Sequence, residues 1–290
     1  MAPLTRRRDL MDDHAPAYVA ARSVLLDALE ALGSQREAII IVGAQAVYLR
    51  TGDVGITGYA PYTIDADLAV VPSRLADEPR IEELMGDADF EQKGEPGVWW
   101  KTVNIEGIAT EVEVDVMVPQ RYAPPGGRRS ARLPPHDKMV ARKAIGLEGS
   151  ILDHDLIEVS ALEGADPRRY TVRVAGPAAL VVAKLYKLRD RLAEGKTNRM
   201  ADKDAADVYR LMLAVPVPEF LRQLRPLLDD EMAGPVCREA VVMMAQLFGA
   251  RGAAGVRMAN DALRVAVPSE RVADVCTGFV LRVQQSLEGS

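Results

Sequence analysis

The stretch that decides the fold is YTIDADLAV, residues 62–70, in which two aspartates interrupt an otherwise apolar run. Its aliphatic and β-branched residues predict a strand over 63–71. Side chains two apart on a strand point to the same face, so Asp65 and Asp67 project together and the apolar side chains between them face the other way. Two carboxylates this close repel each other, and burying them without partners is costly. The stretch therefore indicates either a cation site or a solvated edge face.

A second acidic strand follows in EVEVDV, residues 111–116. Glu111, Glu113 and Asp115 again share one face of the expected strand. If this strand neighbours the first, it supplies a third carboxylate. We select Asp115 because it lies nearest the C-terminal end of the strand, with Glu113 in reserve. The alternative is a charged outer face that contacts only solvent.

Three carboxylates of this kind are typical ligands for hard divalent cations. Carboxylate oxygens suit Mg²⁺ or Mn²⁺, and two such ions about 3.5–4 Å apart activate an attacking hydroxyl and hold a triphosphate. We therefore predict Asp65, Asp67 and Asp115 as metal ligands and catalytic residues. Thr63 shares the face of Asp65, and its hydroxyl is expected at the metal site or on a phosphate; the alternative is an ordinary strand threonine.

The segment IIIVGAQAVYL, residues 39–49, predicts a buried strand at 38–42, a glycine and then a helix. A glycine after a strand lets the backbone approach a phosphate, and the start of a helix offers free N–H groups. Gly43 and Ala44 are accordingly predicted to bind a nucleotide. An ordinary tight turn is the alternative.

The elements are segregated along the chain. Strands crowd residues 1–175, whereas the pattern from 176 to 290 is almost entirely helical. This predicts an α+β, bilobed protein: a first lobe with a mixed sheet and flanking helices, and a helical second lobe. A length of 290 residues also favours two domains. The remaining expected elements, in chain order, are helices over 15–32, 78–88 and 137–146, strands over 98–105, 108–118, 155–162 and 170–175, and helices over 177–194, 200–214, 217–228, 235–248 and 270–286.

Composition limits the classes of function. The net charge of −6 excludes a uniformly basic nucleic-acid coat but leaves room for a local basic patch. The N-terminus has no apolar signal region, and no apolar run approaches the roughly 20 residues of a membrane span. Two cysteines lie far apart at Cys237 and Cys276. We expect a cytoplasmic protein with free thiols and no membrane partner.

Together these residues resemble the nucleotidyltransferase superfamily with the polymerase β-like core. Its pattern is an apolar strand ending in Gly-Gly or Gly-Ser, then D-x-D or D-x-E, then a third acid on a nearby strand. Gly43, Asp65 with Asp67, and Asp115 match it, whereas Ala44 replaces the usual Gly or Ser and offers no hydroxyl. The longer gap from Gly43 to Asp65 resembles the AbiEii-like toxins of type IV toxin–antitoxin systems, including the MenT type.

The helical half resembles the same toxins. Their further signature is similar to LVVAKLYKLRDR at 180–191 and DKDAADVYRLM at 202–212. Lys184 matches the signature lysine, and Asp204 and Asp207 match its two aspartates. The resemblance implies that Lys184 holds the triphosphate and that one aspartate orients it while the other contacts ribose, base or metal. Lys184 and Asp204 are therefore expected to be catalytic, and Lys184 and Asp207 to bind nucleotide. A surface pair with Lys203 is the alternative.

Two stretches are locally basic, 121–143 and 184–203. If both line a cleft, they form a channel for a triphosphate and a polyanionic acceptor, with Trp99, Trp100 and Tyr122 as stacking surfaces. The residues expected to contact RNA are Arg121, Arg128, Arg129, Arg132 and Lys187.

The leading hypothesis is an enzyme: a nucleotidyltransferase toxin that uses Mg²⁺ or Mn²⁺ to move a nucleoside monophosphate from an NTP to RNA. The resemblance implies the tRNA 3′ end as acceptor, a block of translation, and a cognate antitoxin protein encoded nearby. A second hypothesis keeps the site and transfers the nucleotide to a protein or small-molecule hydroxyl. A third is a catalytically silent module that binds RNA or a partner protein.

Overall fold

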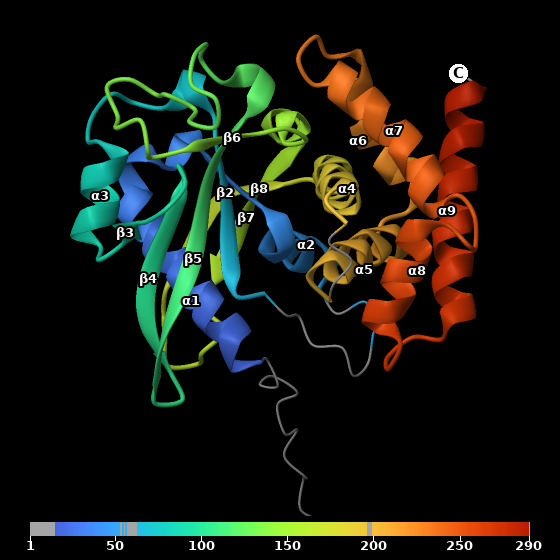
Figure 1. Cartoon of the computed structure of the whole chain (residues 1–290), viewed down its shortest axis with the longest axis horizontal. Coiled ribbons are helices and arrows are strands. Elements are labelled where there is room, and N and C mark those ends of the chain that lie inside the picture. Colours follow the sequence, from blue (N-terminus) through green and yellow to red (C-terminus); the bar gives the residue numbers. More distant parts are fainter. Residues whose placement is uncertain (1–14, 53, 55, 57–62, 196–198, 290) are drawn as a thin grey trace, which may run out of the picture.

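The computed structural model describes residues 15–52, 54, 56, 63–195 and 199–289. In this part of the chain one mixed sheet has the strand order β3-β4-β5-β2-β1-β8-β7, and β6 pairs with the end of β5. Helices flank the sheet and then form a separate layer at one side of it (Figure 1). The α+β class predicted from the sequence is therefore confirmed. The strands are β1 Ile39–Val42, β2 Asp65–Val70, β3 Glu91–Gln92, β4 Val98–Ile105, β5 Ile108–Pro119, β6 Arg142–Ala144, β7 His154–Ser160 and β8 Arg169–Ala175.

The central strands have one fully apolar face. Ala66 and Leu68 of β2 and Val114 and Val116 of β5 are completely buried. β2 runs antiparallel to β1 and parallel to β5. Because the side-chain period is two, this register turns the residues between the apolar ones, including the aspartates, to the opposite face.

The first helices pack on and beside this sheet. α1 Pro16–Ala31 lies against the sheet, as expected from its apolar spacing, and α2 Gly43–Thr51 follows β1 directly. Figure 1 shows α2 between the sheet and the later helices α4 and α5. Gln45 of α2 accepts from Arg22 of α1 and donates to the backbone carbonyl of Asp65. This buried contact fixes the start of β2 relative to both helices.

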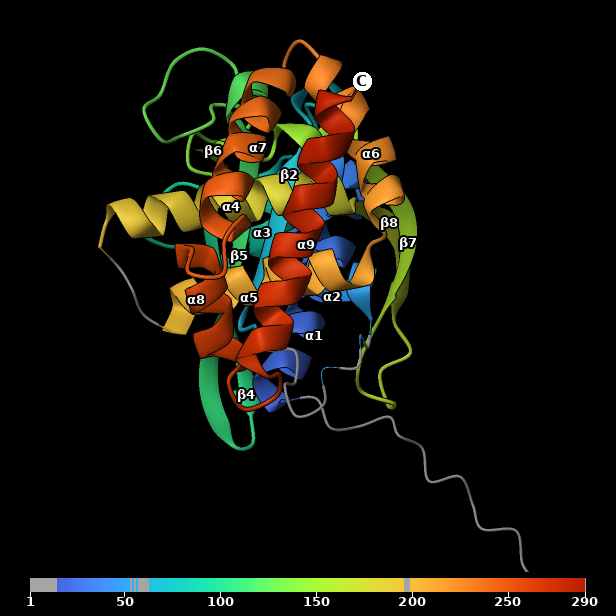
Figure 2. The ribbon, with the colours of Figure 1, turned by 90° about the vertical axis from the view of Figure 1, so that its right-hand side faces the viewer.

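The helical half begins directly after β8. Its elements are α4 Pro177–Ala193, α5 Arg199–Ala214, α6 Val217–Asp229, α7 Gly234–Phe248, α8 Ala254–Leu263 and α9 Ser269–Glu288. In the view of Figure 2, α7, α8 and α9 lie in front of α4 and α5. The division into domains at 175/176 stays a prediction.

Among the described residues, no helix combines the length and apolarity needed to cross a membrane. Cys237 and Cys276 are free, as predicted, and both are buried.

Three sequence predictions about local structure were wrong. The helix expected over 137–146 does not form: the segment pairs as the short strand β6 with β5, because β5 extends past β4 and leaves backbone groups to be satisfied. Helix α8 was not expected. The third helix, α3 Ile81–Asp87, starts after Pro79 rather than including it in its first turn. Residues 51–62 hold three glycines and one proline, which predicts a loop, and they lie mostly outside the described residues.

Candidate active site

The acidic faces of β2 and β5 meet as the sequence predicted. In the parallel register Asp67 is opposite Asp115, and Asp65 is opposite Glu113. Asp67 and Asp115 are buried, whereas Asp65 and Glu113 are partly exposed. Glu111, at the outer end of the same face, is exposed and pairs with Lys93 at 2.7 Å. Neighbouring strands thus place four carboxylates together, and Glu111 belongs to the solvated surface.

Burial and mutual repulsion shift the pKa values of these carboxylates. Burial raises the pKa of Asp67, and the charges of Asp65 and Asp115 add to that effect. Burial and the same neighbouring carboxylates raise the pKa of Glu113 to about 7. Burial also opposes ionisation of Asp65, but the ammonium groups of Lys203 and Lys187 and the hydroxyl of Thr63 outweigh it, so its pKa is lowered.

Only glycine fits at position 43. Its φ of +68° is in the left-handed region, and a Cβ there would lie 1.9 Å from Oδ2 of Asp67. The glycine therefore lets the start of α2 approach the carboxylate. Ala44 is buried, so its contribution to ligand binding is restricted to its backbone.

Thr63 belongs to the site through its hydroxyl. This group is fully buried, donates to Oδ1 of Asp65 and accepts from Nζ of Lys203 at 3.0 Å. Lys203 comes from α5, so the contact joins the helical half to the beginning of β2. Burial lowers the pKa of Lys203, and the charge of Asp65 counteracts this.

Sequence reasoning included Arg142 only in the basic stretch 121–143 and did not select it as a partner of the carboxylates. Its guanidinium donates to both oxygens of Asp115, from Nε at 3.2 Å and from Nη2 at 2.6 Å. Burial lowers the pKa of Arg142, but the charge of Asp115 outweighs it and the net shift is upward. The residue lies in the segment predicted to be helical, and only the pairing of β6 with β5 brings it to the carboxylates. A local sequence pattern gave no signal for that pairing.

Lys184 lies in a closed ion cluster. Its Nζ is 2.7 Å from Oδ1 of Asp204 and 2.6 Å from Oδ2 of Asp207, and all three side chains are buried. Arg191 reaches the other oxygen of Asp204 at 3.0 Å. Burial opposes the charge on Lys184, but the two aspartates raise its pKa. Burial likewise opposes ionisation of Asp204, yet Lys184, Lys187 and Arg191 lower its pKa to about 2. The three residues predicted from the toxin signature therefore do come together.

A cavity of about 240 Å³ opens between the acidic face and α4. Gly43, Asp67, Arg142, Lys184 and Lys187 all contribute to its wall. Nζ of Lys187 is 3.8 Å from Oδ1 of Asp67, whose charge raises the pKa of the lysine. Apolar side chains, among them Ile145 and Leu180, complete the wall. Lys187, which the sequence had assigned to RNA, thus lies beside the carboxylates.

A loop over residues 121–132, called the basic loop because it carries four arginines, lies next to this cavity. Lys143 lines the cavity, and its Nζ donates to the carbonyls of Gly126 and Gly127 in the loop. Arg121, Arg128 and Arg132 are exposed there, and Arg129 is exposed but paired with Glu95. Of the residues expected to stack on a base, Trp99 is excluded, because it is buried and donates from Nε1 to the carbonyl of Val140.

The donor set fits a divalent cation. Asp65, Asp67 and Asp115 offer hard oxygens on adjacent strands. Burial, and after it the charges of Asp65 and Asp115, raise the pKa of Asp67, and a bound cation would offset both effects. In the described residues no three such side chains already converge on one point. Instead the carboxylates turn to Thr63, Lys187 and Arg142.

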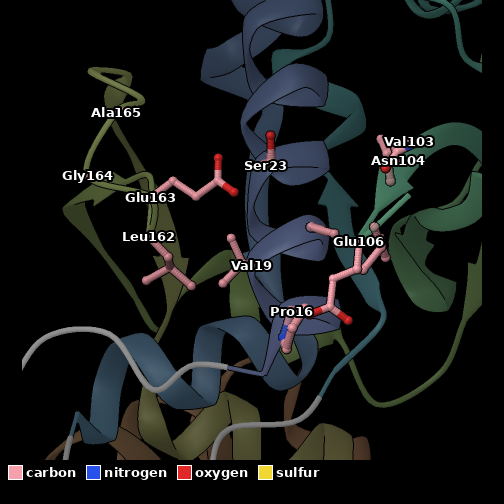
Figure 3. Close-up of a pocket in the computed structure, with 12 residues that line it drawn as sticks. Pro16, Val19, Ser23, Val103, Asn104, Glu106, Leu162, Glu163, Gly164 and Ala165 are labelled. Atoms are coloured by element: carbon pink, nitrogen blue, oxygen red, sulfur yellow. The ribbon is translucent and has the colours of Figure 1, made fainter. Parts of the chain in front are cut away.

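A larger cavity than this one lies elsewhere in the structure. Its volume is about 690 Å³, and it lies between α1, the β4–β5 turn and residues 162–165 after β7. Figure 3 shows Val19 and Ser23 of α1 facing Leu162 and Glu163 across it. None of the predicted site residues lines this cavity. Its size therefore does not make it the centre of the chemistry.

Comparison with known proteins agrees with this geometry. A family model described as nucleotidyltransferase matches residues 21–230, a range that contains every carboxylate and basic side chain of the site. No curated protein and no solved structure matches the chain.

Proposed function

The chain belongs to the nucleotidyltransferase family, and from this membership and the geometry of the site we propose that it transfers a nucleoside monophosphate from an NTP to RNA. The observation that carries the proposal is the placement of Asp65, Asp67 and Asp115 together on two paired strands, with Asp67 in the wall of a cavity that Arg142, Lys184 and Lys187 also line. Nucleotidyl transfer needs such oxygen ligands where a triphosphate binds.

The carboxylates are proposed to hold Mg²⁺ or Mn²⁺. A divalent cation bound there would act as a Lewis acid toward the acceptor hydroxyl and the phosphates. The chain's own contribution is to position these groups. Gly43 brings the N-terminus of α2 next to Asp67, where its backbone N–H groups favour negative charge. Thr63 and Lys203 hold the carboxylate of Asp65 in place.

The proposed reaction is an in-line substitution at phosphorus. The acceptor oxygen forms a bond to the α-phosphorus of the NTP, the bond from that phosphorus to the bridging oxygen breaks, and pyrophosphate leaves with the electron pair. The acceptor hydroxyl passes its proton to solvent water. Basic side chains at the cavity stabilise the charge on the departing pyrophosphate.

The choice of RNA as acceptor rests on the basic loop beside the cavity. Arg121, Arg128 and Arg132 extend from the chain segment that Lys143 ties to the cavity wall. Exposed arginines at the mouth of a site suit a polyanionic acceptor. The resemblance to AbiEii-like and MenT-type toxins supports the tRNA 3′ end as the position modified, a toxic block of translation, and a cognate antitoxin.

The test is transfer of label. Purified full-length protein and Mg²⁺ are incubated with total tRNA and each α-³²P-labelled nucleoside triphosphate in turn, beside Asp65→Ala and Asp67→Asn. Asp87→Ala is the matched control, because Asp87 is exposed on α3, away from the site. We expect label on tRNA with the wild type and the control, and a loss of at least about 10²-fold in the two site variants.

Other outcomes separate the competing hypotheses. Label on protein, or on a small hydroxyl compound added in place of tRNA, would transfer the proposal to that acceptor. The absence of label from folded wild-type protein, with RNA binding unaffected by Asp65→Ala, would contradict enzymatic transfer and favour a silent binding module. Circular dichroism of each variant confirms that it is folded.

A further inference from the structure

Two basic side chains from different elements are paired with two of the site carboxylates. Arg142 of β6 makes two hydrogen bonds to Asp115, and Lys187 of α4 lies 3.8 Å from Asp67. Both basic residues line the same cavity of about 240 Å³ as Asp67. A ligand entering this cavity therefore meets the two cations and Asp67 at the same time.

These two cations differ from Lys184 in their access to solvent. The side chain of Lys184 is 4% exposed and lies between two aspartates. Those of Arg142 and Lys187 are 30% and 40% exposed, and each has a single carboxylate partner among the ion pairs described for it. A cation that is open to solvent can change partners without itself becoming a buried, uncompensated charge, whereas Lys184 cannot.

The backbone under Arg142 is fixed, so only its side chain can change partner. Gly97 lies directly against this segment: a Cβ there would be 2.6 Å from the backbone nitrogen of Arg142. The backbone N–H of Lys143 donates to the carbonyl of Arg129 on one side, and β6 pairs with β5 on the other. The guanidinium thus extends from a clamped strand into an open cavity.

Charge balance favours an exchange of partners. In the ligand-free site, Asp65, Asp67 and Asp115 face Lys203, Lys187 and Arg142. A nucleoside triphosphate brings roughly four negative charges, and two divalent cations bring roughly four positive ones. If the cations bind the carboxylates and the basic side chains bind the phosphates, every charge keeps an opposite neighbour.

We propose that Arg142 and Lys187 are exchangeable counter-ions that neutralise Asp115 and Asp67 in the ligand-free protein and move to the phosphates when an NTP binds. The carboxylates are thereby released for divalent cations only when the triphosphate is present. The planar fork of Arg142 suits two phosphate oxygens, and Lys187 acts as a point charge on a flexible stem. This inference rests on the proposed function, because it assigns a triphosphate to that cavity.

The test measures two ligands separately by isothermal titration calorimetry: inorganic tripolyphosphate without metal, and Mn²⁺ without phosphate. The variants are Arg142→Gln and Lys187→Gln, with Arg282→Gln as a control that removes one exposed positive charge from α9. We expect each site variant to bind tripolyphosphate about tenfold more weakly and Mn²⁺ about tenfold more tightly than the wild type. The control should change neither affinity.

Opposite changes for the two ligands are the signature of exchange. If a variant weakens both ligands, the residue has a structural role and the proposal is wrong. If Mn²⁺ binds more tightly and tripolyphosphate is unaffected, the residue only masks a carboxylate, and the proposal is again wrong. Thermal melting verifies folding, and if Arg142→Gln is unfolded, Arg142→Lys and Lys187→Gln decide the question.

The binding experiment does not depend on nucleotide transfer. If tripolyphosphate and Mn²⁺ respond as expected but no acceptor is ever labelled, the proposed reaction fails and the exchange of counter-ions stands. If label is transferred but the two affinities do not move in opposite directions, the reaction stands and the exchange is refuted.

Discussion

Lys184 and Lys187 lie one helical turn apart on α4, yet they belong to two different kinds of ion cluster. Lys184 is closed in by Asp204 and Asp207, whereas Lys187 is open to the cavity and loosely paired with Asp67. The residue types are the same in both clusters. Burial alone makes one cluster a fixed link between α4 and α5 and leaves the other available to a ligand.

The closed cluster also explains how a helical half can serve a site on a sheet. α4 and α5 carry every member of that cluster, and α5 also provides Lys203, which reaches Thr63 beside Asp65. By fixing α5 against α4, the buried ions hold both Lys187 and Lys203 over the acidic face. The closed cluster therefore holds α4 and α5 together, and the open cluster is the one that we propose binds the ligand.

The largest expected effect is on the closed cluster. Lys184→Met should lower the free energy of unfolding by about 3–5 kcal/mol, because it leaves the buried carboxylate of Asp207 without its lysine and that of Asp204 with Arg191 alone. Urea unfolding followed by circular dichroism measures this. Lys187→Met is the matched change one turn later, and its expected effect is under about 1 kcal/mol because the pair is partly exposed.

A triple variant breaks the comparison if it is wrong. Lys184→Met combined with Asp204→Asn and Asp207→Asn removes all three charges and should recover most of the stability lost by Lys184→Met alone. If Lys184→Met is as stable as the wild type, or if the triple variant recovers nothing, the closed cluster is not held by its charges.

A second, smaller effect is expected on acidification. The pKa of Asp204 is lowered to about 2 from an ordinary value of 3.8. A depressed carboxyl pKa contributes stability that is complete above the unfolded value and is lost as the pH falls through the folded one. Asp204 should therefore contribute roughly 2 kcal/mol that disappears between about pH 4 and pH 2.

The difference between wild type and Asp204→Asn isolates this contribution. Their free energies of unfolding, measured by urea titration from pH 7 downward, should converge below about pH 2, where the wild-type carboxyl is also neutral. A constant difference across that range would show that Asp204 acts through its shape and not through its charge.

The sequence predicted the acidic face because strand geometry is local. Asp65 and Asp67 share a face whatever the strand pairs with, and so do Glu113 and Asp115. That β2 and β5 are neighbours is a long-range fact, and the resemblance to nucleotidyltransferases, not periodicity, indicated it. The same resemblance placed Lys184 with Asp204 and Asp207.

Burial and long-range pairing were beyond the sequence. The pattern around Arg142 was interpreted as a helix, and the residue became part of the site only because β6 completes an edge of β5. Lys187 was assigned to RNA, since nothing in LYKLRDR distinguishes a lysine over a cavity from one on the outer surface. Tertiary packing decides both cases.

Two glycines with positive φ, only one of which lies against Asp67, give the finest test of the open cluster. Gly43 and Gly52 both have positive φ, so alanine at either position should cost at least about 1 kcal/mol of stability. Their surroundings differ: an added Cβ at Gly43 would lie 1.9 Å from Oδ2 of Asp67, whereas at Gly52 it meets nothing within 4 Å. Gly43→Ala must therefore displace the carboxylate, and Gly52→Ala need not.

Nucleotide transfer by the two variants, measured at matched amounts of folded protein, should fall in Gly43→Ala and remain near the wild type in Gly52→Ala. Equal activity in both would mean that the position of Asp67 against the start of α2 does not matter for the chemistry, and the open site would then have to be built from Asp65 and Asp115 alone.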